Sequence, residues 1–462
     1  MDKKLKGIES KEEDTVRNAL QKGDFFTRLS VIMLGMGNFA RKEWIKGSLF
    51  LASEILFIAL MIGFGIPSLA MVPSLGTKET GEVFNEVTQV YEYVQGDNSM
   101  LILLYGVITC FLIAGFFIIW RANIKSAYQA YVRQQKGQRI PTFIEEMKEY
   151  LDSKLHKTLL FLPVMGILIF TIMPLIFMIS MAFTNYDRDH QAPGKLFDWI
   201  GLTNFVKVLD FTGDLGKTFW PVLGWTIVWA IFATFLNYIF GMILSIVINR
   251  KDTKFKSFWR FGFVLSIAVP SFVTLLIMNQ MLQPNGAINV LLREIGLIGA
   301  NTSLPFLTDT TWARVTVIVI NIWIGVPYTM LTMTGILQNI PNDLYEAARI
   351  DGANAMTIFW KITIPYMLFV TAPSLITTFV GNINNFNVIY LLTGGAPATM
   401  EYYKMTAGKT DLLVTWLYKL TIDNKDYSFG AVIGILVFVI TATSSLIVYR
   451  RTSAYKNEEG FQ

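Results

Sequence analysis

Charged residues are scarce in this sequence. Only 16% of its 462 residues are Asp, Glu, Lys or Arg, whereas 53% are hydrophobic. A soluble domain carries about a quarter charged residues. The shortage excludes a soluble two-domain enzyme. It predicts a polytopic membrane protein, because several uncharged runs exceed the roughly 20 residues that cross a bilayer.

Cysteine and histidine are scarcer still. The single Cys110 excludes an intramolecular disulfide, and its apolar surroundings predict a small buried hydrophobic residue. The two histidines, His156 and His190, provide no metal-ligand constellation, so we expect no metal site. Residues Met1–Lys22 are highly charged and lack an apolar core, which predicts that there is no cleavable signal peptide.

Eight long apolar segments are present, and we predict that each spans the membrane. Their approximate bounds are Ser48–Ile66, Met100–Trp120, Leu159–Phe183, Val222–Ile248, Phe263–Leu282, Val315–Leu337, Met367–Leu392 and Phe429–Tyr449. The preceding stretch Leu29–Lys46 is apolar but is interrupted by four charged residues. We predict an interfacial helix there, with a short re-entrant span as the alternative.

Basic residues orient these spans, because cytoplasmic loops collect Lys and Arg. The connector after the second span, the loop after the fourth span and the C-terminal tail are the basic segments. They contain Arg121, Lys125, Arg133, Lys136, Arg139, Lys148, Lys154 and Lys157, then Arg250, Lys251, Lys254, Lys256 and Arg260, then Arg450, Arg451 and Lys456. By contrast, Pro67–Ser99 has only Lys78 and Gln283–Thr311 only Arg293. Both termini are therefore predicted to be cytoplasmic.

This pattern divides the chain into five parts. They are a cytoplasmic N-terminal segment with the interfacial helix (1–47), an accessory transmembrane pair (48–120), a cytoplasmic connector (121–158), a core of six spans (159–449) and a cytoplasmic tail (450–462). The predicted fold class is all-α and polytopic.

Ionisable residues are nearly absent from the spans. The fourth to eighth spans have no Asp, Glu, Lys or Arg, and Glu54 in the first span is the main exception. Ion-coupled transporters place such residues in the membrane to carry the coupling. If solute moves uphill here, the energy therefore comes from outside the membrane, as with a docked ATPase. The chain itself has no phosphate-binding loop, since Gly216-Lys217-Thr218 and Gly408-Lys409-Thr410 lack the earlier glycine.

One stretch between the sixth and seventh spans has a distinctive pattern, Glu346–Pro365, within a loop at 341–365. Pro341 is suited to the first position of a helix, which has no amide to lose. Gly352 is suited to its end, because glycine accepts the left-handed conformation. Ala353–Lys361 would form a second short helix that Pro365 stops. The alternative is an ordinary interhelical loop.

The sixth span carries unusual polarity. Asn321, Gly325 and Tyr328 share one helix face, at offsets of four and seven residues. Pro327 frees a backbone carbonyl on the preceding turn and is expected to favour a kink.

The seventh span has four asparagines within 382–387. Thr378, Asn382 and Asn385 again fall on one face. Such amides are costly in hydrocarbon unless they face protein or a water-filled cavity. Amides and a phenol without any countercharge suit a neutral polyhydroxylated ligand, because carboxamides both donate and accept hydrogen bonds. The alternative is hydrogen bonding between spans.

The stretch at 346–365 resembles the EAA loop of ATP-binding-cassette (ABC) importer permeases. It has Glu346-Ala347-Ala348, three residues, Gly352, nine residues, and then Ile-x-hydrophobic-Pro. In that family the loop is the coupling helix that docks into a cleft of the cytoplasmic ATPase. The resemblance implies that Glu346 makes a charged contact to the ATPase. The remaining coupling residues that it implies are Tyr345, Ala347, Ala348, Asp351 and Gly352.

From about Lys157 onward the chain is similar to the larger, MalF-type permease of maltose and maltodextrin ABC importers. The segments that carry the likeness are FTNY at 183–186, VPSF at 269–272, NIWIGVPY at 321–328, NNF at 384–386 and GGAP at 394–397. The resemblance implies sugar contacts at Asn321, Ile324, Gly325, Tyr328, Thr378, Gly381, Asn382 and Asn385. Gly381 stands where some relatives have an aromatic residue, which would widen the pocket. The outer loop Thr184–Pro221 is short where enteric relatives carry an extra domain, so that domain's contacts cannot be transferred.

These features predict the non-catalytic permease subunit of an ABC importer for maltose or maltodextrin in a bacterial plasma membrane. The implied partners are a second permease, two ATPase subunits that bind ATP and Mg²⁺, and an extracellular solute-binding protein. We expect no cofactor in this chain and no nucleic-acid binding. The alternatives are a permease for another solute (raffinose-type, amino-sugar or glycerol-phosphate-like), an ion-coupled transporter or channel, and a membrane enzyme. The sequence offers no nucleophile–base set for an enzyme and no intramembrane cation for a phosphorylated ligand.

Overall fold

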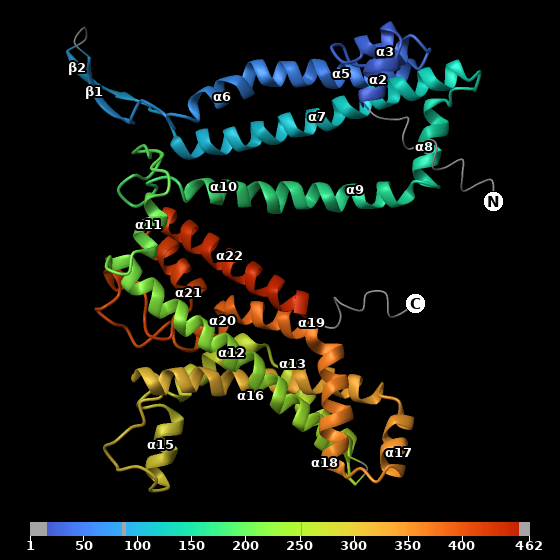
Figure 1. The fold of residues 1–462 in the computed structure, drawn as a ribbon. Helices are drawn as coiled ribbons and strands as arrows, with labels where there is room; N and C mark the ends of the chain where they lie inside the picture. The colour runs from blue at the N-terminus through green and yellow to red at the C-terminus, as the bar shows by residue number, and fades with distance from the viewer. Residues whose placement is uncertain (1–15, 86–88, 251, 452–462) are drawn as a thin grey trace. The chain divides into compact units, whose positions relative to one another are not determined.

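The computed structural model describes residues 16–85, 89–250 and 252–451. The chain divides into two compact units, Met1–Ile200 and Gly201–Gln462, and each is described by itself (Figure 1). Residues 1–15 of the predicted cytoplasmic segment, Lys251 and most of the predicted tail lie outside the described residues.

The described residues of unit 1 form helices, one β-hairpin and the loops that connect them. Its helices are α2 (Val16–Lys22), α3 (Phe25–Leu29), α4 (Met36–Phe39), α5 (Trp44–Leu60), α6 (Ile66–Met71), α7 (Ser99–Gln135), α8 (Phe143–Leu151), α9 (Leu155–Ile167) and α10 (Met173–Met181). Single π-helical turns join α5 to α6 and α9 to α10, so each pair continues as one long helix. Strands β1 (Gly81–Asn85) and β2 (Val90–Val94) pair antiparallel, with Phe84 opposite Tyr91.

The prediction of one helix over Leu29–Lys46 is wrong, and its interfacial position stays a prediction. The chain turns at Gly35 (φ 86°), forms the short α4, and enters α5 at Trp44. Charges that seemed to line a surface helix instead lie within this turn, where Arg41 pairs with Asp24 at 2.7 Å and its side chain is only 1% exposed.

Side chains of the long helices hold this N-terminal turn. The Asn123 side chain accepts from the Gly35 amide (2.9 Å) and donates to the Ser30 carbonyl (2.8 Å). Glu54, the exception among the spans, accepts from the Leu34 amide at 2.8 Å. Glu54 thus has a structural partner.

Burial raises the pKa of Asp24, but hydrogen bonds from neighbouring side chains outweigh burial, so the net pKa is lowered.

Cys110 corrects a second expectation. We predicted a buried residue, but Cys110 lies on an exposed face of α7 within unit 1. Helix α7 buries other positions, such as Leu103, Val107 and Ile124. The apolar composition around Cys110 reflects a span, and a span presents apolar residues on every face.

Unit 2 contains the long helices that carry the candidate site. Its helices are α11 (Thr203–Leu209), α12 (Asp214–Asn249), α13 (Lys256–Ala268), α14 (Ser271–Met281), α15 (Ala287–Glu294), α16 (Thr310–Gln338), α17 (Asn342–Ile350), α18 (Ala355–Ile358), α19 (Ile364–Ile383), α20 (Phe386–Leu392), α21 (Leu413–Tyr418) and α22 (Tyr427–Arg451). Figure 1 shows α17 and α18 at one end of unit 2, and α21 with its neighbouring loops at the other.

The predicted fifth span is bent. Helices α13 and α14 meet at 84° across Val269-Pro270. Pro270 has no amide hydrogen for a continuous helix and disfavours the helical conformation at the preceding residue, so the first helix ends at this point. Within the described residues, the other predicted spans correspond to seven helices that are long and apolar enough to cross a membrane. The bent pair brings the number to eight, and the all-α polytopic class is confirmed.

Two buried clusters hold unit 2 together. The larger joins α12, α14, α16 and α20 through residues that include Trp229, Leu275, Val317 and Ile389. The smaller joins α12, α16 and α19 through Tyr238, Met333 and Met367. Helices α16 and α19, which carry the predicted polar faces, are therefore both packed against α12. The five-part domain division stays a prediction, and the third long helical segment (155–181) lies in unit 1.

Candidate functional site

The loop at 341–365 contains the predicted turn. Helix α17 begins at Asn342 with Pro341 as its N-cap, one residue later than expected. Gly352 has φ +78°, and the Ala353 amide donates to the Ala348 carbonyl at 2.9 Å. This left-handed glycine closes the helix end, as the sequence predicted.

The second half of this loop differs from the expectation. Helix α18 continues through a π-helical turn, Phe359–Thr363, into α19, so one helix runs over Ala355–Ile383. Pro365 lies in the first turn of α19 and stops nothing. Proline is tolerated in the first turn of a helix, where the backbone amide has no hydrogen bond to lose. The π-helical turn before α19 puts Pro365 in such a position.

Most residues predicted to contact an ATPase lie on the surface of α17. Glu346, Ala347, Asp351 and Gly352 are exposed, while Tyr345 and Ala348 are half-buried. The Tyr345 hydroxyl hydrogen-bonds to the Thr363 hydroxyl at 3.2 Å and so ties α17 to the following helix. This bond links any movement of α17 to the start of α19.

An exposed apolar rim and a polar cavity flank these residues. Ile350 is 85% exposed and Met356 is 64% exposed. A cavity of about 710 Å³ opens between the end of α12 and α17. Its charged lining residues are Arg250, Asp252, Glu346 and Arg349. Protein interfaces combine apolar and polar side chains, and both kinds are exposed here.

The three predicted polar residues of α16 lie in different environments. Asn321 is 7% exposed, and its Nδ2 has no hydrogen-bond partner among the described residues. Gly325 faces α12 so closely that a Cβ there would lie 2.6 Å from Asn237. Tyr328 is 69% exposed, and Ile324 is half-buried. Helix α16 runs through Pro327 as a single helix.

The predicted residues of α19 are divided in the same way. Thr378 and Gly381 are exposed. Asn382 is buried, and its Nδ2 donates to the Thr234 hydroxyl of α12 at 3.0 Å. Asn385 is half-buried, donates to the Asn382 side-chain oxygen at 3.4 Å, and caps α20 by accepting from the Val388 amide at 3.3 Å.

Interhelical bonding thus accounts for part of the asparagine cluster. The Trp229 indole also donates to the Asn382 carbonyl at 3.0 Å, so α12 holds both the side chain and the backbone of that residue. The surface of α16 and α19 instead includes the exposed Tyr328, Thr378 and Gly381, and the buried Asn321 Nδ2 has no hydrogen-bond partner among the described residues. The helices around this surface, Val315–Leu337 and Met367–Leu392, contain no charged residue. The surface can bind neutral hydroxyl groups but has no charge with which to neutralise an ion.

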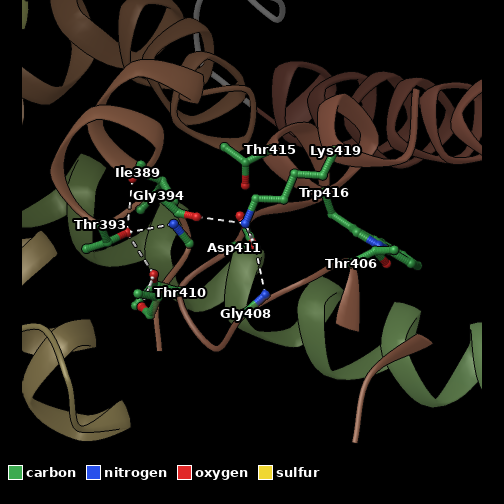
Figure 2. Close-up of polar contacts among 12 residues, drawn as sticks. Ile389, Thr393, Gly394, Thr406, Gly408, Thr410, Asp411, Thr415, Trp416 and Lys419 are labelled. Carbon is green, nitrogen blue, oxygen red and sulfur yellow. Dashed lines mark hydrogen bonds and ion pairs between the residues drawn. The ribbon is translucent and has the colours of Figure 1, made fainter. Parts of the chain in front are cut away.

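We call the predicted site residues of α16 and α19 the polar face. After it in the sequence comes a buried network of polar contacts that the sequence did not reveal (Figure 2). Asp411 is fully buried and accepts from the Lys419 ammonium (2.6 Å) and the Gly408 amide (2.7 Å). Lys419 also donates to the Gly394 carbonyl at 2.7 Å. Gly395 packs directly against Asp411 and leaves no room for a side chain, since a Cβ there would lie 2.2 Å from an Asp411 oxygen.

Burial raises the pKa of Asp411, and Lys419 opposes that shift. The two residues lie eight positions apart in a stretch that also contains Glu401, Lys404, Lys409 and Asp423, so no spacing distinguished them. Among the residues that the structure describes, no group of three His, Cys, Asp or Glu side chains lies together as a metal site.

Comparisons with known proteins place these observations in context. Residues 237–453 match the family described as "Binding-protein-dependent transport system inner membrane component". The chain is 37% identical over 434 residues to the galactooligosaccharides transport system permease protein GanP of Bacillus subtilis, covering 92% of this chain and 97% of that protein. It is 33% identical over 464 residues to the maltodextrin transport system permease protein MalC of Streptococcus pneumoniae, covering 98% and 100%.

Shorter and more distant similarities extend the same pattern. The maltose/maltodextrin permease MalF of Escherichia coli is 34% identical over 272 residues, which is 58% of this chain and 52% of that protein. One solved structure, a bacterial ABC transporter involved in the import of the acidic polysaccharide alginate, aligns with a TM-score of 0.52 at 22% identity. The alignment covers 66% of this chain and 96% of the other, and at this identity it indicates a shared fold.

Proposed function

Because this chain belongs to the family of binding-protein-dependent transport system inner membrane components, the permease subunits of ABC importers, we propose that it imports a neutral oligosaccharide. One observation carries the proposal of a neutral solute. The segments Val315–Leu337 and Met367–Leu392, which present Tyr328, Thr378 and Gly381, lack charged residues, and their polar side chains at the proposed site are uncharged amides and hydroxyls. An anionic solute would need a cation here.

Maltodextrin is the solute that we propose first. The maltodextrin permeases MalC and MdxF are 33% and 34% identical over nearly their whole lengths. The contact residues proposed are the two asparagines and the tyrosine at 321, 382 and 328, together with Ile324, Gly325, Thr378, Gly381 and Asn385. Of these, Tyr328, Thr378 and Gly381 are accessible in the single chain.

A galactooligosaccharide is the second candidate, and the 37% identity to GanP favours it. Both sugars are neutral and polyhydroxylated, so the absence of charge does not separate them. Uptake of a labelled maltodextrin by the assembled transporter, in competition with galactooligosaccharides, raffinose and a sugar phosphate, makes the distinction. Competition by the sugar phosphate alone would contradict a neutral solute.

ATP hydrolysis by a separate subunit pair is part of the proposal. The exposed α17 surface would dock into that ATPase, with Glu346 as the charged contact. The remaining docking residues would be Tyr345, Ala347, Ala348, Asp351 and Gly352. The Tyr345–Thr363 bond would transmit movement of α17 to α19.

The remaining partners are a second permease and an extracellular solute-binding protein. We propose that both termini are cytoplasmic, because the basic residues collect in the connector 121–158, the loop after α12 and the tail. The core 159–449 would then form half of the translocation path, with 48–120 as an accessory pair. Co-purification of the chain with an ATPase, and loss of uptake when ATP is withheld, test this proposal against an ion-coupled transporter.

A further inference from the structure

Three aromatic rings gather directly beyond the last asparagines of the polar face. Phe386 and Tyr390 of α20 stack with ring centroids 4.7 Å apart. Tyr418 of α21 meets both rings edge-on, at 5.0 Å from Phe386 and 5.3 Å from Tyr390. We call Phe386, Tyr390 and Tyr418 the aromatic ledge.

The aromatic ledge lies outside the hydrophobic core of unit 2. Helix α20 buries Val388, Ile389 and Leu392 in that core. Tyr390 is 38% exposed, and Phe386 is half-buried. Helix α20 therefore already has a buried face, and the rings occupy the face that the core does not use.

The buried network in Figure 2 holds Lys419 and Trp416, which are close neighbours of Tyr418 in the chain. Lys419, the next residue, bridges Asp411 and the Gly394 carbonyl just after α20. Trp416, two residues earlier, donates from its indole nitrogen to the Thr406 hydroxyl at 2.9 Å. These contacts hold α21 and the end of α20 in one fixed arrangement.

The aromatic ledge is continuous with the polar face. Asn385 caps α20 immediately before Phe386 and contacts Asn382. Asn384 and Asn387, on either side, are exposed. Fixed aromatic rings next to a few amides are the composition of a small-molecule site, in which rings supply contact area and polar groups supply orientation.

From this arrangement we propose that the aromatic ledge is a further subsite for oligosaccharides, which stacks against sugar units beyond those at the polar face. The inference rests on the proposed function. It adds that the ledge discriminates by length, because the rings lie beyond the asparagines and a longer sugar would contact more of them than a disaccharide does. Two other roles for these rings are anchoring at the membrane interface, where tyrosine is common, and packing against the second permease.

A series of sugars of increasing length tests the inference. The assembled transporter with its ATPase and solute-binding protein is reconstituted in vesicles. Initial uptake is measured against the concentration of sugar-loaded binding protein, for a disaccharide and a heptasaccharide of the transported class. The readout is the ratio of kcat/KM for the heptasaccharide to kcat/KM for the disaccharide, which cancels differences in protein level and docking.

Tyr390→Ala and Tyr418→Ala are expected to lower this ratio about three- to tenfold, the effect of losing one aromatic contact. Tyr390→Phe, which keeps the ring, should restore it to within about twofold. Phe211→Ala is the matched control, because Phe211 is 68% exposed and stacks on Trp220 at 4.4 Å.

An unchanged ratio, or the same shift for Phe211→Ala, would overturn the subsite. If the ratio stays unchanged because uptake of both sugar lengths falls equally, the rings would serve in anchoring or subunit packing and not as a subsite. If the unmodified transporter carried no oligosaccharide, the proposed function itself would fail, and that result is distinct from a length effect.

Discussion

Removing the Lys419 ammonium should destabilise unit 2 strongly. The change Lys419→Met leaves the Asp411 carboxylate, which is fully buried, without its counter-ion. Breaking a buried pair on one side costs about 3–5 kcal/mol. Because the Lys419 side chain is 18% exposed, we take the lower end of that range. With about 2–4 °C per kcal/mol for a unit of this size, the melting temperature should fall by roughly 6–12 °C.

The complementary variant is expected to cost less. Asp411→Asn keeps an acceptor for the Gly408 amide, and the partly exposed Lys419 can still reach water, so the cost should be about 1–2 kcal/mol. In the double variant neither charge is left unpaired. Its cost should therefore fall short of the sum of the two single costs by at least about 1 kcal/mol.

The pH dependence gives a second readout. In Lys419→Met the folded-state pKa of Asp411 rises further above its unfolded value, because burial remains and the cation is gone. A raised carboxyl pKa makes the folded state take up a proton, so the stability deficit shrinks as the pH falls and grows as the pH rises. Thermal unfolding of the chain in nanodiscs at several pH values measures both effects. Strictly additive costs, or a Lys419→Met variant that melts within about 1 °C of the unmodified chain, would refute this reasoning.

Three further changes separate coupling, binding and folding. Glu346→Lys should leave the protein in the membrane but uncouple ATP hydrolysis from uptake. Glu294→Lys, an exposed control on α15, should leave hydrolysis and uptake coupled. Normal uptake by Glu346→Lys would contradict the docking role. Asn321→Leu should not lower the melting temperature, because it removes a buried Nδ2 that has no hydrogen-bond partner in the described part of the chain. It should nevertheless reduce uptake at least about tenfold, and unimpaired uptake would exclude Asn321 from the site. The lowered pKa of Asp24 implies stability that is present at neutral pH and lost as the pH falls below about 4, because an ionised Asp24 is favoured in the folded turn. Proteolysis of the 24–46 turn should therefore rise in acid. The Asp24→Asn variant should be cleaved readily at every pH.

The sequence determined the membrane class and the eight spans because both depend on local composition. It also placed Gly352 correctly, since a left-handed helix end requires glycine. It failed where tertiary contacts override local pattern. Arg41 looked like an interfacial charge until its pairing with Asp24 was seen, and Pro365 looked like a stop signal until the π-helical turn before it was seen.

The candidate site was foreseen only in part. Helical spacing identified Asn321, Tyr328, Thr378 and Asn382 as facing residues, but spacing cannot distinguish an amide that binds a neighbouring helix from one that faces a ligand. The structure gives Asn382 a partner on α12 and leaves Tyr328 and Thr378 exposed. The Asp411–Lys419 pair and the aromatic ledge bring together residues from separate helices and loops, and no sequence period records such contacts.

Sugar protection of a single cysteine tests the polar face most directly. In a Cys110→Ser background, Thr378→Cys and Gly381→Cys each place a thiol on the exposed part of that face, and Ser271→Cys is an exposed control on another helix. Labelling by a hydrophilic maleimide is followed in the assembled transporter, trapped with loaded binding protein and a non-hydrolysable ATP analogue. Maltodextrin or a galactooligosaccharide should slow labelling at 378 and 381 but not at 271. Equal labelling with and without sugar at all three positions would contradict a sugar-contacting face.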